Sequence, residues 1–297
     1  MVSALIGIFE WIFELLRDPL VDGVTSLMEY IFGSIGGGLT DIQGLLGDTP
    51  ATYNATIYSI VRTTSESVIL PIAMAVLVII SMYELVMNVA NTSNMKEFDV
   101  WGVVKWILKF LFSLFVLAHT FQFAEWIFSI GPIIAGHMLG TGGVSEGITD
   151  TAVILNGIED LTDTMSIWAL IGFFAVSVVI ALAMFVTQII LTTYMLFRFM
   201  EIYLTLSLAP IPMATFGSKE YSRMGEGFIK TILSYVLQVF LIILAIAIYT
   251  GLINVTIGGM IASGAYDGMA TIQLLAITII MVMMITKTKS LAREILG

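Results

Sequence analysis

The residues of this chain that could do chemistry are polar side chains set within long apolar segments. Ser81, Glu84 and Asn88 recur at helical spacing towards the end of one apolar run. Ionisable groups inside a membrane are costly, so they are functional candidates by default. The stripe predicts either the lining of a polar conduit or a contact between helices. The alternative is that Glu84 and Asn88 only reach the lipid headgroups.

A second group of candidates surrounds two prolines. Arg198 and Glu201 lie three residues apart on one helix face, so they are predicted to pair. Pro210 and Pro212 remove two backbone donors, and the residue before each is expected to be extended. Non-helical backbone at membrane depth needs protein or a water-filled cavity beside it. The stretch predicts an internal pathway or a subunit contact; a plain helix stop and an interfacial ion pair are the alternatives.

Polar residues in other apolar segments have simpler interpretations. His119, Gln122 and Glu125 recur at every third position, as a proton relay would, although hydrogen bonds across a helix bundle explain them equally. Gln238 is expected to form such a bond. The sequence has no cysteine and no HExxH, Walker A or GxSxG motif. We therefore expect no enzymatic activity, no metal and no cofactor.

The composition of the chain indicates that these residues lie in a membrane protein. The chain has 297 residues, of which 58% are hydrophobic and 11% charged, and its mean hydropathy is +1.00. Soluble domains carry about 25% charged residues, so the solvent of this chain must be lipid. Its apolar runs are continuous, which favours helices over a barrel. We expect an all-α polytopic membrane protein. The net charge of −10 argues against a general nucleic-acid-binding surface.

Five apolar runs are long enough to cross a bilayer, which takes about 20 residues. They cover residues 68–88, 104–128, 165–197, 228–253 and 270–285. Residues 1–65 are expected to form an extracytoplasmic amphipathic helix and a connector, with a break at Gly36–Gly38; a full first span is the rival interpretation of residues 1–33. Residues 66–297 would form the transmembrane bundle, with an outer loop at 136–163.

Lysine and arginine predict which ends face the cytoplasm. They cluster at residues 96–109, 219–230 and 287–293, each beside an apolar run. Because such segments stay inside, the five spans place the N-terminus outside and the C-terminus in the cytoplasm. Arg198 and Arg223 then lie on the same side. Residues 199–215 between them are therefore predicted to form an interfacial or re-entrant helix.

The sequence that begins at Arg198 carries a family resemblance. Residues 198–217 read RFMEIYLTLSLAPIPMATFG, and residues 225–230 read GEGFIK, followed by a span that contains Gln238. This stretch resembles the TrbL-like polytopic proteins of conjugation and type IV secretion, and it looks like the branch carried by mobile elements of Gram-positive bacteria. The resemblance is strongest over residues 165–255. It implies an outward N-terminal amphipathic helix followed by about five spans.

The resemblance also implies a function. It implies a non-enzymatic channel or scaffold component of a conjugative machine in the cytoplasmic membrane. Such a component helps single-stranded DNA with its relaxase leave the cell, together with other membrane subunits and cytoplasmic ATPases. A homo-oligomer in membrane lipid is expected, and direct DNA contact is left open. Arg198, Glu201, Pro210 and Pro212 are its candidate switch or assembly contacts.

The alternative function is a secondary transporter or another polytopic solute permease. Transporters usually show internal repeats with interrupted helices at matching positions. Only one interrupted segment is apparent in this sequence, at residues 199–215. This pattern favours the translocation component.

Overall fold

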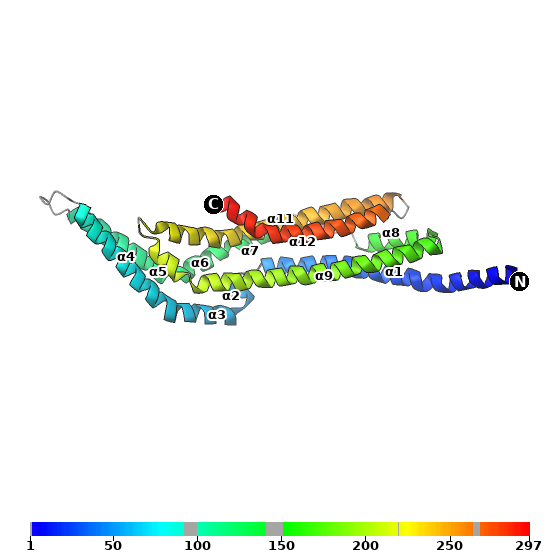
Figure 1. Ribbon diagram of the computed structural model, residues 1–297, viewed down its shortest axis with the longest axis horizontal. Helices are drawn as coiled ribbons and strands as arrows, with labels where there is room; N and C mark the ends of the chain where they lie inside the picture. Colours follow the sequence, from blue (N-terminus) through cyan, green and yellow to red (C-terminus); the bar gives the residue numbers. More distant parts are fainter. Residues whose placement is uncertain (1, 92–99, 141–150, 219, 264–267) are drawn as a thin grey trace. The chain divides into compact units, whose positions relative to one another are not determined.

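The structure is a computed structural model that describes residues 2–91, 100–140, 151–218, 220–263 and 268–297. Every regular element within these ranges is a helix (Figure 1). Five helices of this part are long and apolar enough to cross a membrane. The expected all-α polytopic fold is confirmed.

The helices succeed one another along the chain with short connections. They are α1 (Val2–Leu46), α2 (Pro50–Tyr53), α3 (Ala55–Thr64), η1 (Ser65–Ile69), α4 (Leu70–Asn91), α5 (Val100–Ala118), α6 (Thr120–Phe128), α7 (Ile130–Gly140), α8 (Thr151–Thr164), α9 (Ile167–Ser207), α10 (Pro210–Thr215), α11 (Ser222–Ser263) and α12 (Gly268–Leu296). Element η1 is a π-helix that joins α3 to α4. Helices α9 and α11 have 41 and 42 residues. At 1.5 Å per residue each is about 60 Å long, twice the hydrocarbon thickness.

Three local predictions differ from the structure. Helix α1 runs through Gly36–Gly38, where a break is predicted, because each glycine costs a helix only about 1 kcal/mol. The predicted second span, 104–128, is divided between α5 and α6 at His119, whose backbone leaves the helical region. Helices α7 and α8 occupy both ends of the predicted loop 136–163. Its residues 141–150 lie outside the described part.

The chain divides into two compact units. Unit 1 consists of Met1–Gly44, Gly136–Met195 and Leu241–Lys287. Buried apolar side chains of α1, α9, α11 and α12 form its core. The Thr278 hydroxyl of α12 donates to the Met184 sulfur of α9 at 3.7 Å. Unit 1 is thus a packing of long helices around an apolar core.

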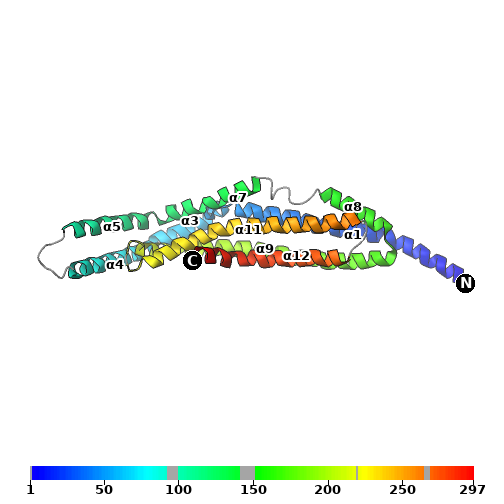
Figure 2. The same cartoon turned by 90° about the horizontal axis from the view of Figure 1, so that it is seen from above.

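Unit 2 consists of Leu45–Ala135, Leu196–Phe240 and Thr288–Gly297. Within it, α4 and α5 lie side by side as a hairpin in both views (Figures 1 and 2). Helix α10 packs against this hairpin. Its residues Met213 and Ala214 share an apolar cluster with residues of α4 and α5. Unit 2 therefore holds both the hairpin and the proline-containing segment.

The two prolines of unit 2 start a helix. Ala209 has φ −51° and ψ −37°, which is helical, and Pro210 is the first residue of α10. The expectation of extended backbone before each proline is wrong. The physical reason is that the first N–H groups of a helix have no intrahelical partner, so prolines in the first turn lose no bond.

Gly225 allows α11 to approach the turn after α10. A Cβ here would lie 2.8 Å from the Phe216 Cα and 3.0 Å from the Pro212 carbonyl oxygen. Because backbone atoms cannot move aside cheaply, Gly225→Ala is expected to destabilise the protein by about 1–3 kcal/mol. The measurement is the thermal unfolding midpoint in detergent.

Gly227→Ala is the matched control on the same helix. A Cβ at Gly227 would meet nothing within 4 Å. This substitution is expected to stabilise the helix by up to about 1 kcal/mol, because alanine is the better helix former. A Gly225→Ala protein as stable as Gly227→Ala would contradict the close approach.

Candidate functional site

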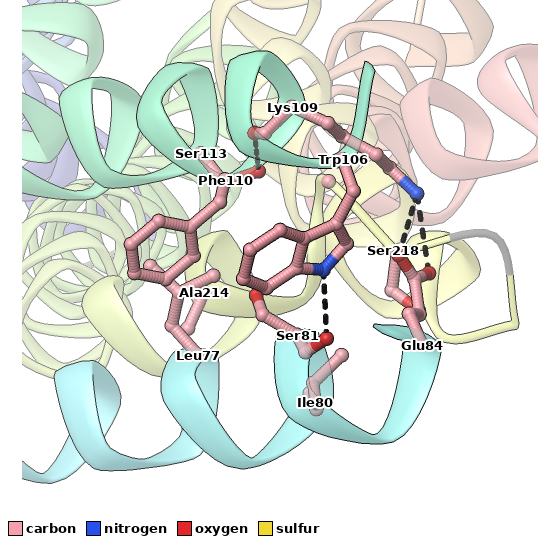
Figure 3. Close-up of a pocket in the computed structure, with 11 residues that line it drawn as sticks. Leu77, Ile80, Ser81, Glu84, Trp106, Lys109, Phe110, Ser113, Ala214 and Ser218 are labelled. Carbon is pink, nitrogen blue, oxygen red and sulfur yellow. Dashed lines mark hydrogen bonds and ion pairs between the residues drawn. The ribbon is translucent and has the colours of Figure 1, made fainter. Parts of the chain in front are cut away.

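A small polar pocket lies between α4, α5 and the turn after α10 (Figure 3). Its space is on the order of one water molecule. The polar residues that line it are Ser81 and Glu84 of α4, Trp106, Lys109 and Ser113 of α5, and Ser218. The pocket thus combines two residues of the predicted polar stripe with the chain beyond the two prolines.

An ion pair forms one wall of the pocket. Lys109 Nζ lies 2.8 Å from one carboxylate oxygen of Glu84 and 3.1 Å from the other. The Glu84 side chain is 13% exposed and that of Lys109 33%. The attraction between opposite charges is stronger in such a partly desolvated place than in water. Of the interpretations left open for Glu84, these contacts support the contact between helices.

One further bond joins α4 to α5, and a second lies within α5 beside the pocket. The Trp106 indole N–H donates to the Ser81 carbonyl at 2.8 Å, and the Ser113 hydroxyl donates to the Lys109 carbonyl at 2.9 Å (Figure 3). A Cβ at Gly217 would overlap the Ser113 hydroxyl, so the turn after α10 lies directly on α5. The pocket therefore lies where three separate segments meet.

The spacing of Arg198 and Glu201 suggests that they pair with each other, but their described side-chain bonds are with other helices. Arg198 is only 5% exposed. Its Nη2 donates to the Tyr235 carbonyl of α11 at 3.2 Å. Glu201 forms an ion pair with Lys289 of α12, whose Nζ is 2.6 Å from Oε2, and lies 3.6 Å from Arg293. The two residues thus attach α9 to two different helices.

Away from the pocket, Glu125 of α6 accepts a hydrogen bond from the hydroxyl of Tyr58 in α3 at 2.5 Å. His119 Nδ1 lies 2.9 Å from the Phe115 carbonyl oxygen of its own helix. The Gln122 side chain is exposed. These contacts support the interpretation of this trio as bonding groups, because His119 and Glu125 have separate partners.

Two ion pairs lie at the two ends of an apolar stretch of η1 and α4. Arg62 pairs with Glu66 at 2.8 Å near one end, and Glu84 pairs with Lys109 at the other. No charged residue lies between Glu66 and Glu84 in the sequence. At 1.5 Å per residue this stretch is about 25 Å long, close to the 30 Å or so of a hydrocarbon core.

The remaining predicted residues are placed as follows. Pro210 is buried at the start of α10, and Pro212 is half-buried in its first turn. Gln238 is buried in α11. The side chain of Asn88 lies outside the described part of the structure.

Several residues of the site are missed by sequence reasoning. They are Trp106, Lys109, Ser113, Ser218 and Lys289. A signal existed for Lys109 alone: it is a cation in the run that follows the one with Glu84, and consecutive spans joined by a short loop form an antiparallel pair. The other residues have no comparable sequence signal, because their roles depend on which segments meet in the fold.

The predicted re-entrant segment, 199–215, comprises parts of two helices. Phe199 packs in a cluster with Phe121 near the α6 end of the hairpin. Ala214 packs with Leu77, beside the pocket. The segment therefore extends along the hairpin, and its interfacial or re-entrant placement stays a prediction.

Two contacts near the end of α9 also bear on the predicted topology. The Tyr203 hydroxyl donates to the Pro50 carbonyl at 2.8 Å, and Glu201, two residues earlier, pairs with Lys289. The charge pattern separates Pro50 from Lys289 by the membrane, whereas both reach the end of α9. Arg198 is one source of this disagreement. The positive-inside rule counts it as a loop residue, but its side chain is buried. The sidedness of the termini stays a prediction.

Comparison with known proteins assigns the chain. A family model described as TrbL/VirB6 plasmid conjugal transfer like protein matches residues 35–210, more than half of the sequence. No curated protein and no solved structure gives a significant match. The matched range contains the α4–α5 hairpin and α9, and it ends at Pro210. With five helices able to cross a membrane, the chain is a multi-pass cell-membrane protein that belongs to the TrbL/VirB6-like family of conjugal transfer proteins.

Proposed function

We propose that this protein is a channel or scaffold component of a conjugative type IV secretion machine, in which it helps single-stranded DNA with its relaxase cross the cytoplasmic membrane. The observation that carries the proposal is the family match over residues 35–210. That range contains α4, α5 and α9, the elements that build the hairpin and hold Arg198 and Glu201.

A structural role fits the contacts of unit 2. Two carboxylates of this unit pair across helices: Glu84 with Lys109, and Glu201 with Lys289. TrbL/VirB6-like conjugation components are structural membrane proteins. We propose that this chain likewise acts by assembly and movement, without catalysis. Its proposed partners are other membrane subunits of the machine, cytoplasmic ATPases and further copies of this chain.

The basic segments beside the pocket support a proposed orientation for part of the chain. The pocket brings Lys109 and Ser218 together, and each lies in or beside a segment rich in lysine and arginine. Positive segments next to spans stay in the cytoplasm. We therefore place residues 89–109 and 217–230 on the cytoplasmic side.

Deleting the gene from a donor cell tests the proposal. Transfer of DNA to a recipient is expected to be lost and to return when the intact gene is supplied in trans. Donor growth and solute uptake should stay unchanged, because the machine serves transfer alone. The measurement is the number of recipients that acquire a marked element per donor.

Two results would count against this function. Unchanged transfer from the deletion strain would remove the conjugative role. Normal transfer combined with lost uptake of a solute would favour the permease. Complementation with the intact gene guards against an effect on neighbouring genes.

A further inference from the structure

A π-helical turn, η1, directly precedes the first helix of the hairpin, α4. Helices α3, η1 and α4 form one unbroken helical run from Ala55 to Asn91. In η1 the Leu70 N–H donates to the Ser65 carbonyl, five residues back. Such a turn holds one residue more than an α-helical turn and often occurs at functional sites. Pro71 explains its position, since a proline ring clashes with the carbonyl four residues earlier in a regular α-helix.

The π turn aligns the buried faces of α3 and α4. Their buried residues are Tyr58, Ser65, Ala73, Leu77 and Ser81. At 100° per residue, Tyr58 and Leu77 would point about 100° apart in a regular α-helix. Because the π turn contains one extra residue, the rotation from Tyr58 to Leu77 is that of about 18 residues, or five full turns. The two side chains therefore point in about the same direction. Element η1 therefore sets the rotation of α4 relative to α3.

The two sides of the π turn are bonded to the consecutive helices α5 and α6. On the α3 side, Tyr58 bonds Glu125 at 2.5 Å. On the α4 side, Glu84 pairs with Lys109 at 2.8 Å, and Trp106 bonds the carbonyl of α4 at Ser81. The two sets of contacts can form together because η1 absorbs the extra residue between them.

We propose that η1 is a register switch. In its second state the π turn closes into an α-helix, and α4 rotates by about 100° around its axis. Every residue of α4 then takes the direction of its successor, so Tyr83 replaces Glu84 opposite Lys109. The residues that move to the buried face form an apolar and aromatic stripe: Ile72, Val76, Ile80 and Tyr83. The hairpin can therefore pack in either register, and the ion pair belongs to one of them.

The register is coupled to α10. Helix α10 packs against both η1 and α4. Ala73 and Ala214 are fully buried in the cluster between α4 and α10. In the second register Ile72 would take the place of Ala73, and its larger side chain would push α10 outward. A close-packed interface responds to such a change by moving as a body. The switch thus moves the segment that starts at Pro210 and covers the pocket.

A buried hydroxyl at the π turn is consistent with two arrangements. Ser65 is fully buried, and its Oγ has no hydrogen-bond partner among the described residues. A buried polar group without a partner costs free energy, so an arrangement that satisfies it competes with the present one. Any role of the switch in DNA transfer rests on the proposed function, but the register change itself does not.

Cross-linking tests the two registers directly, because the chain has no native cysteine. One variant carries Glu84→Cys and Lys109→Cys. The other carries Tyr83→Cys, Glu84→Gln and Lys109→Cys, so that neither keeps the ion pair. A short bifunctional thiol reagent applied to membranes of donor cells should link both pairs. Pro71→Ala should increase the Tyr83 product and decrease the Glu84 product, because it removes the clash that favours the π turn. Absence of the Tyr83 product in both backgrounds would overturn the proposal.

Deleting Ser67 separates a switch from a fixed alignment. The deletion closes the π turn while leaving α3 and α4 in their present registers, so the link between positions 84 and 109 should persist. Transfer should nevertheless be lost, because the second register is no longer reachable. A control deletion of Ile79, beyond the π turn, moves residue 84 to the place of Tyr83, so its link to position 109 should form in the second register only and should increase when Pro71→Ala is added. If deletion of the whole gene abolishes transfer, transfer at the wild-type frequency by the Ser67 deletion would overturn the switch. If the whole gene proves dispensable, the cross-links alone decide whether the second register exists.

Discussion

Lys109→Met is expected to lower the free energy of unfolding by about 3 kcal/mol, the usual effect of removing one partner of a buried ion pair. The Glu84 carboxylate is 13% exposed and lies 2.8 Å from Lys109. The pocket around it also contains the apolar side chains of Leu77 and Phe110. Loss of the cation would leave a carboxylate there without its ion pair. The thermal unfolding midpoint in detergent should fall by roughly 6–12 °C, taking about 2–4 °C per kcal/mol for a chain of this size.

Two matched variants show whether the ion pair is the cause. Lys105→Met removes an exposed lysine of the same helix that lies 5.5 Å from the Trp101 ring, so a change within about 0.5 kcal/mol is expected. Adding Glu84→Leu to Lys109→Met should restore most of the stability, because apolar replacement of a whole buried pair is often neutral. A double variant as unstable as Lys109→Met alone would contradict the ion-pair explanation.

The helical fold was predictable because lipid leaves few alternatives. Backbone groups in hydrocarbon must bond to one another, so a long apolar run is a helix whatever its neighbours are. Each predicted span is mostly helical in the structure, and 228–253, for example, lies inside α11. Local composition suffices for this step, because the constraint acts on each segment separately.

The ends of the helices were less predictable because they depend on distant partners. The span predicted to end at residue 197 belongs to a helix that continues to Ser207. The sequence suggested a boundary there because Arg198 and Glu201 are costly in lipid. In the structure, Arg198 bonds the Tyr235 carbonyl and Glu201 pairs with Lys289, so both charges are accommodated inside a helical bundle. Sequence spacing cannot reveal partners that lie tens of residues away.

The site itself was predictable only in part. The stripe of Ser81 and Glu84 could be found because it repeats with the period of one helix. The contact of Gly217 with Ser113 could not, since it depends on how closely two backbones approach. The π turn was equally hidden: Pro71 is its one local signal, and a proline near the start of a helix is ordinary.

Glu201→Gln is expected to release the last turns of α12 from the rest of unit 2. Its carboxylate holds Lys289, with Nζ 2.6 Å from Oε2, and lies 3.6 Å from Arg293. A neutral amide keeps the size of the side chain but loses the charge-assisted bonds, which contribute about 2 kcal/mol. Local opening of residues 288–296 should then become roughly thirtyfold more frequent. Amide hydrogen exchange of peptides from this region in detergent measures the change.

Glu294→Gln is the matched control, because Glu294 is exposed on the same helix and belongs to none of the described ion pairs. Its exchange rates should equal those of the unchanged protein. Peptides from the first half of α12 should also exchange normally in the Glu201 variant, because that half belongs to unit 1. If exchange instead rose along the whole of α12, Glu201 would be stabilising the helix itself. Unaltered exchange in residues 288–296 would show that the ion pair does not hold the C-terminal turns, and that the apolar contacts of α12 are sufficient.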